Sequence, residues 1–550
     1  MVEYKVIKLK WVKIMNLTDF SLTYPNSEAH KRHYSGSDSV FITNEVMEQL
    51  GLEDIIDLKN SDLGDFFTTD PEIIEYRLEV FSDMLENPEI GQTLVSVVPI
   101  LGDIVELRRL EADGGSTESY LLSISEIELY ISCIDRLQEG FSSFSDRIKS
   151  RAFKAFAERI AELSESDYYK ELNSKLDELT KRVREIKSVT VGVNLDAQLR
   201  PVDAGVLSIN PEYFKSGDVI EKILRMNFKD DEYTCIASLV PFGKNQSENQ
   251  QMALSYAFNS AINEVYKSSL RSWKKIVRSY VLENTDFIIN LLPEMEFIVN
   301  GTKLLRRLRE RGLSLCRPEL APMDERAFDA LGLYNPQVAL KVEDEIVTND
   351  VTFDENGMIY VLTGPNRGGK SVITCAIGLS QAMAQLGLFV PAKSLKISPA
   401  DAIFTHFPQG AEDTIDKGRL GEECARMSEI FERVTPHSLV LLDESLSSTG
   451  SYEASYIAAE VLAGFSRVGC RCIFSTHLHE LSASIDEINA KTAPEGGVKI
   501  DTLVAGIDEG KRSFKIVRAV PDGKSYARDI ADKYGLSYEK ITEKIKKKEP

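Results

Sequence analysis

The chain has 550 residues, more than one hydrophobic core normally organises, so we expect roughly two to four domains. Its composition is 43% hydrophobic, and 86 acidic residues outnumber 65 basic ones, giving a net charge of -21. This balance excludes a compact basic module for nucleic-acid binding, because much of the surface repels phosphate. Any contact with nucleic acid must therefore come from local basic patches.

The cysteines and the N-terminal sequence bear on the cellular compartment. Seven cysteines are scattered along the chain, an odd number that favours a reducing compartment. Cys470 and Cys472 alternate within an apolar run, which predicts core packing in a strand. The N-terminal sequence MVEYKVIKLKWVKIM lacks the apolar centre of a signal peptide, and no uninterrupted apolar run approaches the ~18 residues that span a bilayer. We predict a cytoplasmic protein without a membrane segment.

Residues 1–65 give no chemical signal, although the alternation from Lys5 to Met15 is compatible with a strand. From residue 66 the sequence turns helical. Asp70 is placed to cap a helix that starts at Pro71, and Asn87-Pro88 ends it. Further helical stretches have regularly spaced apolar residues and few glycines; they run over 119–144, 148–163, 168–186, 251–284 and 285–313. We predict a mostly helical domain over residues 66–325.

The residue composition changes at about 188–245, and this stretch interrupts the helical domain. The sequence SVTVGVNLDAQLRPVDAGVLSIN is rich in β-branched residues and turn formers, which predicts a small β-containing insertion. Basic residues cluster around Trp273 and between Lys303 and Arg311. Two interpretations of these clusters stay open: a solvated helix face, or a contact with phosphate.

The last domain, 326–550, alternates predicted strands with predicted helices and contains a glycine-rich loop. An apolar run from Met358 to Leu362 precedes the loop, and a helical pattern follows it from Lys370. This is the pattern G-x-x-x-x-G-K-[ST], whose backbone N–H groups cradle phosphates, whose lysine reaches the β- and γ-phosphates and whose serine holds Mg²⁺. We therefore predict a site for ATP and Mg²⁺ formed by Gly364, Pro365, Asn366, Arg367, Gly368, Gly369, Lys370 and Ser371.

Acidic residues follow a second apolar run, SLVLLDE (438–444). We expect Asp443 to bind Mg²⁺, and Glu444 to orient and deprotonate the attacking water. A third apolar run, from Cys470 to Ser475, leads to His477, which is placed to sense the γ-phosphate, whereas His479 is expected to start a helix. Together these features predict an ABC-type ATPase whose site is completed in trans by a second head, so we expect a homodimer.

Several motifs of this chain resemble those of the MutS family of DNA mismatch-repair ATPases. TGPNRGGKS is similar to the family's TGPN-x-GGKS loop. The stretches GLFVPA (387–392), DAIFTHF (401–407), SLVLLDE (438–444) and STHLHEL (475–481) also resemble family motifs, as do 70–89 at the start of the helical part and 521–537 near the end. The resemblance covers about residues 65–545.

The resemblance implies a division of labour among the domains. It assigns the helical residues 66–325 to a core and lever, the 188–245 insertion to a reduced clamp, and 326–550 to an ABC-type ATPase domain with C-terminal helices. Family members close as dimers around DNA, and ATP binding and hydrolysis change the grip of the clamp.

The sequence also departs from the family pattern. Nothing in residues 1–65 supplies the family's mismatch-reading Phe-x-Glu wedge, and Phe353-Asp354-Glu355 lies just before the phosphate loop. Arg367 stands where relatives commonly have an apolar residue. The trans-acting signature, usually Ser-Thr-Phe with a Glu, is replaced by GRLGEE (418–423). We expect Gly418 and Gly421 to offer backbone N–H donors there, and Arg419 to offer charge. We also expect no nuclease-like tail after residue 545.

Two functions remain open. The first is a dimeric, DNA-binding MutS-like ATPase in mismatch repair or recombination control, with duplex or branched DNA and other repair proteins as partners. The second is an ATP-switched clamp on structured RNA, ribosomes or a protein partner. The net charge and the missing wedge keep the second function open.

Overall fold

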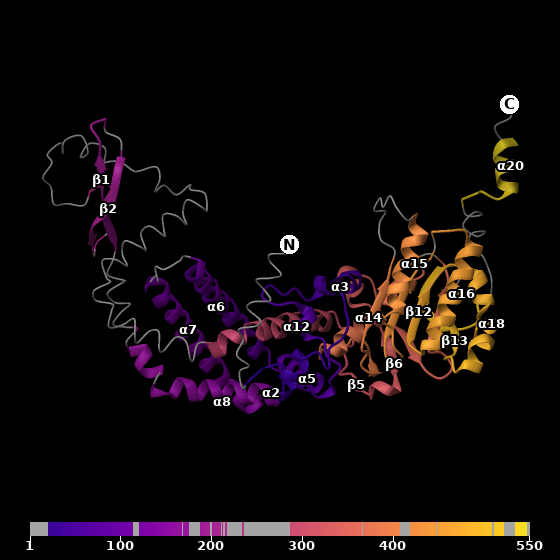
Figure 1. Cartoon of the computed structure of the whole chain (residues 1–550), viewed down its shortest axis with the longest axis horizontal. Helices are drawn as coiled ribbons and strands as arrows, with labels where there is room; N and C mark the ends of the chain where they lie inside the picture. Colours follow the sequence, from indigo (N-terminus) through magenta and orange to yellow (C-terminus); the bar gives the residue numbers. More distant parts are fainter. Residues whose placement is uncertain are drawn as a thin grey trace. The chain divides into compact units, whose positions relative to one another are not determined.

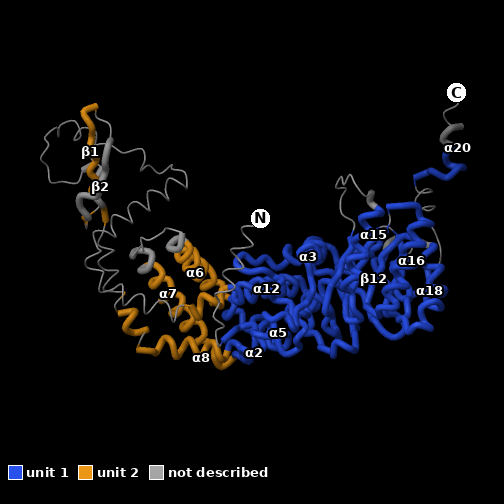
Figure 2. The backbone as a smooth tube through the Cα atoms, viewed as in Figure 1, with its two compact units in different colours: residues 1–91, 148–153, 293–550 blue, residues 92–147, 154–292 orange. Residues whose placement is uncertain are grey.

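The computed structural model describes residues 20–113, 120–167, 169–174, 176, 187–198, 201–210, 212, 215–216, 234–235, 286–365, 367–407, 418–446, 448–508, 511–521 and 534–546. The chain divides into two compact units (Figure 2). Unit 1 comprises residues 1–91, 148–153 and 293–550, and unit 2 comprises residues 92–147 and 154–292. This division by compactness is not the predicted division at residues 66 and 326, so the core/lever, clamp and ATPase assignments stay predictions about function.

Unit 1 is built around a six-stranded sheet. Its order is β10-β11-β12-β8-β13-β14, with bounds Ile403–His406, Leu439–Asp443, Arg471–Ser475, Ile359–Thr363, Ile500–Asp508 and Lys511–Arg518. Neighbours from β10 to β13 are parallel, and β14 is antiparallel to β13. The carboxyl ends of β8, β10, β11 and β12 therefore meet at one edge of the sheet, where α/β folds place their ligand sites.

Helices cover both faces of this sheet, which explains why β8, β11 and β12 are buried at every position. Helix α14 (Lys370–Gln385) packs on one face, where Gly378 lies against Leu441. Helices α15 (Gly418–Phe431), α16 (Ser451–Val468), α17 (His479–Ala483) and α18 (Ile485–Thr492) share a hydrophobic core with the other face (Figure 1). Cys470 and Cys472 are fully buried, so the predicted core packing is confirmed.

A smaller sheet lies earlier in unit 1. Its order is β5-β9-β6-β7, with bounds Glu319–Leu320, Ser394–Ile397, Phe328–Leu333 and Asn349–Phe353. β5 is parallel to β9, and the other pairs are antiparallel. The short helix α13 (Pro336–Lys341) begins after the cap Asn335, and α20 (Tyr538–Lys546) lies near the end of the chain.

The N-terminal segment 20–68 contains α2 (Ser27–Tyr34), α3 (Asn44–Leu50), α4 (Leu52–Ile55) and a 3₁₀ turn, Leu63–Phe66. Buried carboxylates of helix α12 (Leu292–Glu310) hold this segment. Glu294 Oε2 accepts hydrogen bonds from Ser21 Oγ at 2.7 Å, Leu22 N at 2.7 Å and Thr23 N at 2.9 Å. Glu296 accepts from the backbone of residues 59 and 60. A segment without a chemical signal in the sequence is thus tied into the core.

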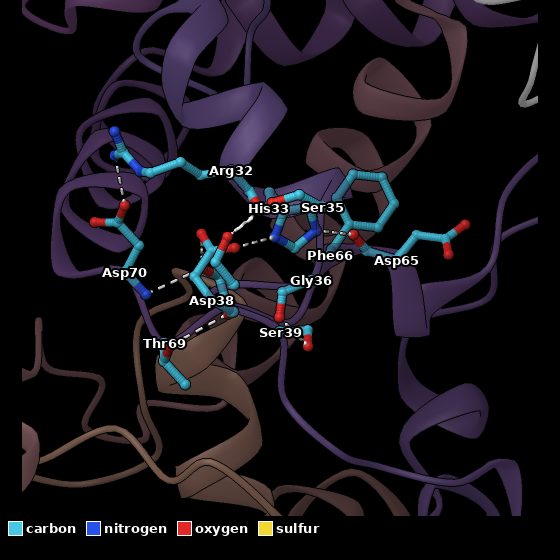
Figure 3. A network of polar contacts seen from close by, with 12 residues as sticks. Arg32, His33, Ser35, Gly36, Asp38, Ser39, Asp65, Phe66, Thr69 and Asp70 are labelled. Carbon is cyan, nitrogen blue, oxygen red and sulfur yellow. Dashed lines mark hydrogen bonds and ion pairs between the residues drawn. The ribbon is translucent and has the colours of Figure 1, made fainter.

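A polar network fastens the same segment to the start of helix α5 (Pro71–Glu86), as Figure 3 shows. His33 Nε2 lies 2.7 Å from the carbonyl oxygen of Asp65, and Arg32 pairs with Asp70 at 2.9 Å. The backbone N–H of Thr69 donates to the carbonyl of Asp38 at 2.8 Å. Asp70 also caps α5 by accepting from the N–H of residue 72, as the sequence predicts.

The segment reaches the larger sheet as well. Phe41 N donates to Asp401 O, and Ile403 N donates to Phe41 O, which forms a parallel bridge at the edge strand β10. The guanidinium of Arg433, just beyond α15, lies 4.7 Å from the centre of the Phe41 ring. Residue 41 therefore covers part of a sheet edge that would otherwise expose unpaired backbone groups.

Unit 2 holds most of the long helix α6 (Pro88–Asp113), together with α7 (Tyr120–Phe144) and most of α8 (Arg151–Glu165). An antiparallel hairpin pairs β1 (Ser188–Leu195) with β2 (Pro201–Asn210), and two-residue strands pair Lys215–Ser216 with Thr234–Cys235. The stretch Pro88–Arg109 is long and apolar enough to cross a membrane by length and composition, although core helices pass the same test. The buried residues of α6, including Ile90, Leu94 and Val97, recur at helical spacing.

The predicted helices over 119–144 and 148–163 are confirmed as α7 and α8, and a strand pair exists in the 188–245 insertion. Helix α6 was not predicted, because Asn87-Pro88 ends α5 and Pro99 lies inside the next helical pattern. The predictions for 5–15, for 251–284 and for the basic cluster around Trp273 lie outside the described residues.

The basic cluster on α12 has contacts that favour the structural interpretation. Arg306 donates to the carbonyl of Met84 at 2.8 Å, and Arg309 donates to that of Leu85 at 3.4 Å, both in the last turn of α5. Such contacts satisfy carbonyls that a helix end leaves without intrahelical partners. Arg311 donates to the carbonyls of Ala339 and Val342 at the end of α13.

Candidate nucleotide-binding site

The glycine-rich loop connects β8, which ends at Thr363, to α14, which begins at Lys370. Gly364 and Gly369 have φ angles of 138° and 94°, which side chains with a Cβ rarely adopt. A Cβ on Gly368 would lie 2.8 Å from the carbonyl oxygen of Pro365. The loop thus requires glycine at the positions where the motif has it. Asn366 lies outside the described residues.

Lys370 is buried at the first turn of α14, with only 4% of its surface exposed. Its Nζ donates to the carbonyl oxygens of Gly364 at 3.1 Å and Pro365 at 3.4 Å. Burial lowers the pKa of Lys370, and the nearby carboxylates of Glu444 and Asp443 oppose this shift. The ammonium group therefore lies inside the loop, within electrostatic reach of both predicted acidic residues. Ser371, the next residue, is exposed.

Asp443 is the last residue of β11 and pairs in register with Ser475, the last residue of β12. Asp443 is 6% exposed, and its Oδ1 atom makes no hydrogen bond within the described part of the chain. The same holds for Oγ of Ser475. Buried polar atoms normally find partners, so two adjacent orphans at one sheet edge indicate a place where a ligand or ion supplies the missing bonds.

Glu444 follows β11 directly and has a φ of 48°, in the left-handed region. Its N–H donates to the carbonyl of Ser475 at 2.8 Å, which ties it to β12. Leu446, two residues later, has a φ of 60° and is fully buried. Two non-glycine residues in this conformation make the turn strained, and such strain is concentrated at functional sites.

The sequence did not single out His406 and Ser445, which meet at this edge. His406 ends β10, and its Nδ1 lies 2.8 Å from Ser445 Oγ, which donates in turn to the carbonyl oxygen of His406 at 2.9 Å. Burial, followed by the charge of Arg426, lowers the pKa of His406 to about 4. The feature that could have identified His406 was its position at the end of a strand parallel to β11.

The predicted γ-phosphate sensor, His477, is exposed and follows the end of β12. Thr476 N donates to Leu362 O, which fixes this turn against β8, and α17 begins at His479 as expected. The predicted trans signature lies elsewhere: α15 begins at Gly418, and Gly421 is exposed. The side chain of Arg419 lies outside the described residues.

An aromatic residue beside the loop was also missed. Phe514 on β14 is 46% exposed and has a φ of 56°. Its Cδ1 lies 3.6 Å from the position of a Cβ built on Gly369. Asn349 holds this turn through bonds to the Phe514 carbonyl and to Ile516 N. An exposed ring next to a phosphate loop offers a stacking surface to a planar base.

The residues of this edge fit a nucleotide with a divalent cation. The loop requires glycine where anions approach, Lys370 supplies a buried positive charge, and Asp443 supplies a buried carboxylate oxygen without a partner among the residues described. Hydroxyl and carboxylate oxygens are the ligands that Mg²⁺ prefers. The chemistry that such a set can perform is phosphoryl transfer to water.

A central parallel sheet covered on both faces by helices places unit 1 among the α/β proteins. A family model described as MutS domain V matches residues 360–545, and one described as the MutS2 N-terminal domain matches residues 69–311. The chain belongs to the MutS family.

Similar proteins carry names from mismatch repair. The DNA mismatch repair protein MutS of Clostridium kluyveri is 28% identical over 419 residues, covering 73% of this chain and 42% of that protein. MutS of Prochlorococcus marinus strain MIT 9301 is 38% identical over 217 residues, covering 38% and 23%. The mismatch repair protein MSH3 of Cryptococcus neoformans is 33% identical over 206 residues, covering 34% and 17%. The chain thus spans less than half the length of these relatives.

Proposed function

We propose that the protein is an ATPase that couples ATP binding and hydrolysis to a dimeric clamp on DNA. The observation that carries the proposal is the buried Lys370 inside a glycine-dependent loop, within electrostatic reach of a buried Asp443 whose Oδ1 has no hydrogen-bond partner among the described residues. The MutS-named relatives support DNA as the ligand. The alternative, a clamp on structured RNA, ribosomes or a protein partner, is kept open by the net charge of -21.

In this proposal the loop residues hold the phosphates. Backbone N–H groups of 364–371 and the ammonium of Lys370 bind the β- and γ-phosphates, while the Ser371 hydroxyl and Asp443 are the ligands for Mg²⁺. Mg²⁺, when bound, offsets the charge of the phosphate oxygens. Glu444 orients the attacking water and accepts its proton, and His477 contacts the γ-phosphate from the next strand.

Turnover measurements on two variants test the enzyme proposal. Glu444→Gln should retain nucleotide binding and lose hydrolysis, because an amide cannot accept the proton of the water. Lys370→Ala should lose nucleotide binding itself. A Glu444→Gln protein that hydrolyses ATP at the wild-type rate would contradict the role of Glu444.

The dimer part of the proposal rests on the expectation that an ABC-type head leaves the γ-phosphate side of its own loop open. A second head would supply donors from residues 418–421 to the γ-phosphate, so that ATP joins the two heads. A cross-link between engineered cysteines near Ser371 and Gly418 should form in the Glu444→Gln protein with ATP and Mg²⁺ and not without nucleotide. Protein carrying one engineered cysteine is the control, and nucleotide-independent cross-linking would contradict the model.

The identity of the macromolecular ligand needs its own experiment. Binding to duplex DNA, branched DNA and structured RNA should be compared as a function of salt, because the number of phosphate contacts sets the slope. Tighter binding to DNA than to RNA at equal salt supports the first function, and the reverse supports the alternative.

A further inference from the structure

The turn that carries Glu444 is strained, so something must hold it. Glu444 and Leu446 both have positive φ angles, and residues with a Cβ pay roughly 1–3 kcal/mol each for such conformations. Ser445 lies between them and is 2% exposed. Glu444 directly follows Asp443, so the conformation of this turn sets the direction of the Glu444 carboxylate.

Three contacts hold this turn in place. The N–H of Glu444 donates to β12 through the Ser475 carbonyl at 2.8 Å. Leu446 is fully buried in the core shared by the sheet and α16. The third attachment is the pair of contacts between Ser445 and His406, residues 39 positions apart that the parallel register of β10 and β11 brings together.

Hydrogen-bond chemistry fixes the tautomer of His406. Ser445 has one hydroxyl proton, and the carbonyl oxygen of His406 can only accept, so for both contacts to be hydrogen bonds the proton must go to that carbonyl at 2.9 Å. Nδ1 of His406, 2.8 Å from the same Oγ, must then be the donor. The imidazole therefore carries its proton on Nδ1, and its side chain and its backbone together grip one hydroxyl group.

We propose that His406 is a positioning residue for the hydrolytic step: its Nδ1–H and its carbonyl lock Ser445 and thereby hold Glu444 in its strained conformation. This inference rests on the proposed ATPase function. His406 does not need to touch the nucleotide. Its loss leaves the phosphate loop and Lys370 in place and lets the turn relax, so that the carboxylate of Glu444 leaves its catalytic direction.

Three substitutions of His406 distinguish a role in positioning Ser445 from a general role in stabilising the fold. The amide nitrogen of asparagine can occupy the place of Nδ1, so His406→Asn should retain the donor to Ser445. Glutamine places its amide near Nε2 instead, and leucine has no donor, so His406→Gln and His406→Leu should both lose the contact. His437→Leu is a matched control, because this histidine precedes β11 at the opposite end of the strand.

Steady-state kinetics and nucleotide affinity are the measurements. We expect kcat to fall at least roughly tenfold in His406→Leu and His406→Gln with the affinity for a fluorescent ATP analogue unchanged, and to stay within about twofold of wild type in His406→Asn and His437→Leu. Ser445→Ala should lower kcat similarly, and adding it to His406→Leu should lower kcat no further. Equal loss in the Asn and Leu variants, or a parallel loss of affinity, would overturn the proposal.

A second readout does not depend on turnover. The ¹⁵N chemical shifts of histidine-labelled protein, assigned with His406→Asn, should show the Nδ1–H tautomer at His406. An Nε2–H tautomer would overturn the inference directly. A wild-type protein that neither binds nor hydrolyses ATP would instead refute the proposed function. Active wild type with unaffected His406→Leu refutes only the positioning role.

Discussion

Unit 1 buries carboxylates in two regions, and their surroundings differ. Beside the N-terminal segment, Glu294 accepts three hydrogen bonds, and Glu296 accepts the N–H groups of Lys59 and Asn60. At the sheet edge, Asp443 is equally buried, yet its Oδ1 has no partner within the described residues. A carboxylate that the protein satisfies itself, such as Glu294, is a structural tie, whereas an unsatisfied carboxylate oxygen within electrostatic reach of the lysine of a glycine-rich loop indicates a ligand.

The largest expected effect is on the structural side of this comparison. Glu294→Ala leaves the Ser21 hydroxyl and the Leu22 N–H without their acceptor, while the Thr23 N–H keeps only Ser21 Oγ at 3.0 Å, so we expect a loss of about 3–5 kcal/mol in unfolding free energy. Denaturant titration measures it. Glu28→Ala, at a side chain 83% exposed, is the control and should change stability by less than about 0.5 kcal/mol. A loss of unfolding free energy below about 1 kcal/mol in Glu294→Ala would show that Glu294 is not a structural tie and would remove its contrast with Asp443.

Histidines in both regions should make the fold sensitive to acid. Burial lowers the pKa of His406 and of His30 to about 4, below the ordinary 6.5. The unfolded chain therefore binds protons first, and stability that is fully present above pH 6.5 is lost as pH falls towards 4. For His406 this amounts to about 3 kcal/mol at most.

Substituting each histidine tests its share of this acid sensitivity. His406→Asn and His30→Asn should each flatten the decline of unfolding free energy between pH 6.5 and 4, measured by denaturant titration. Neither variant should lower kcat at pH 7.5, because His30 lies outside the site and asparagine keeps the contact at residue 406. A decline as steep as that of wild type in both variants would show that other titratable groups dominate the pH dependence of stability.

On the ligand side, Asp443→Ala should separate activity from stability. Without the carboxylate, kcat should fall at least roughly 100-fold, which corresponds to about 2.7 kcal/mol. The unfolding free energy should stay equal or rise, because an unsatisfied buried group is removed. Paired measurements of turnover and denaturation on one preparation test this. A destabilisation as large as that of Glu294→Ala would make Asp443 another structural tie.

The smallest expected effect concerns Phe514. Removing the exposed ring beside Gly369 should raise KM for ATP about three- to tenfold without changing kcat, since stacking on a base contributes about 1 kcal/mol. Val517→Ala, another exposed apolar residue on β14, is the control. An unchanged KM in Phe514→Ala would place the base elsewhere.

The sequence predicts features that depend on neighbouring residues and misses contacts between residues that are far apart in the chain. The loop, α14, the strand ending at Asp443 and the start of α17 were predicted because each depends on neighbouring residues. The ties of the N-terminal segment were not, because Ser21 and Glu294 are 273 residues apart and no periodicity connects them. His406 and Ser445 were missed for the same reason, since only the register of the sheet brings them together. Functional roles at the site remain predictions.

The central claim is that the sheet edge with Lys370 and Asp443 binds a nucleotide. The most direct test is the unfolding free energy of the Glu444→Gln protein with and without Mg²⁺–ATP, with Lys370→Ala as the control. The account predicts a rise of about 2.7 kcal/mol at a nucleotide concentration 100 times Kd, and no rise in Lys370→Ala. No rise in either protein, or an equal rise in both, would contradict it.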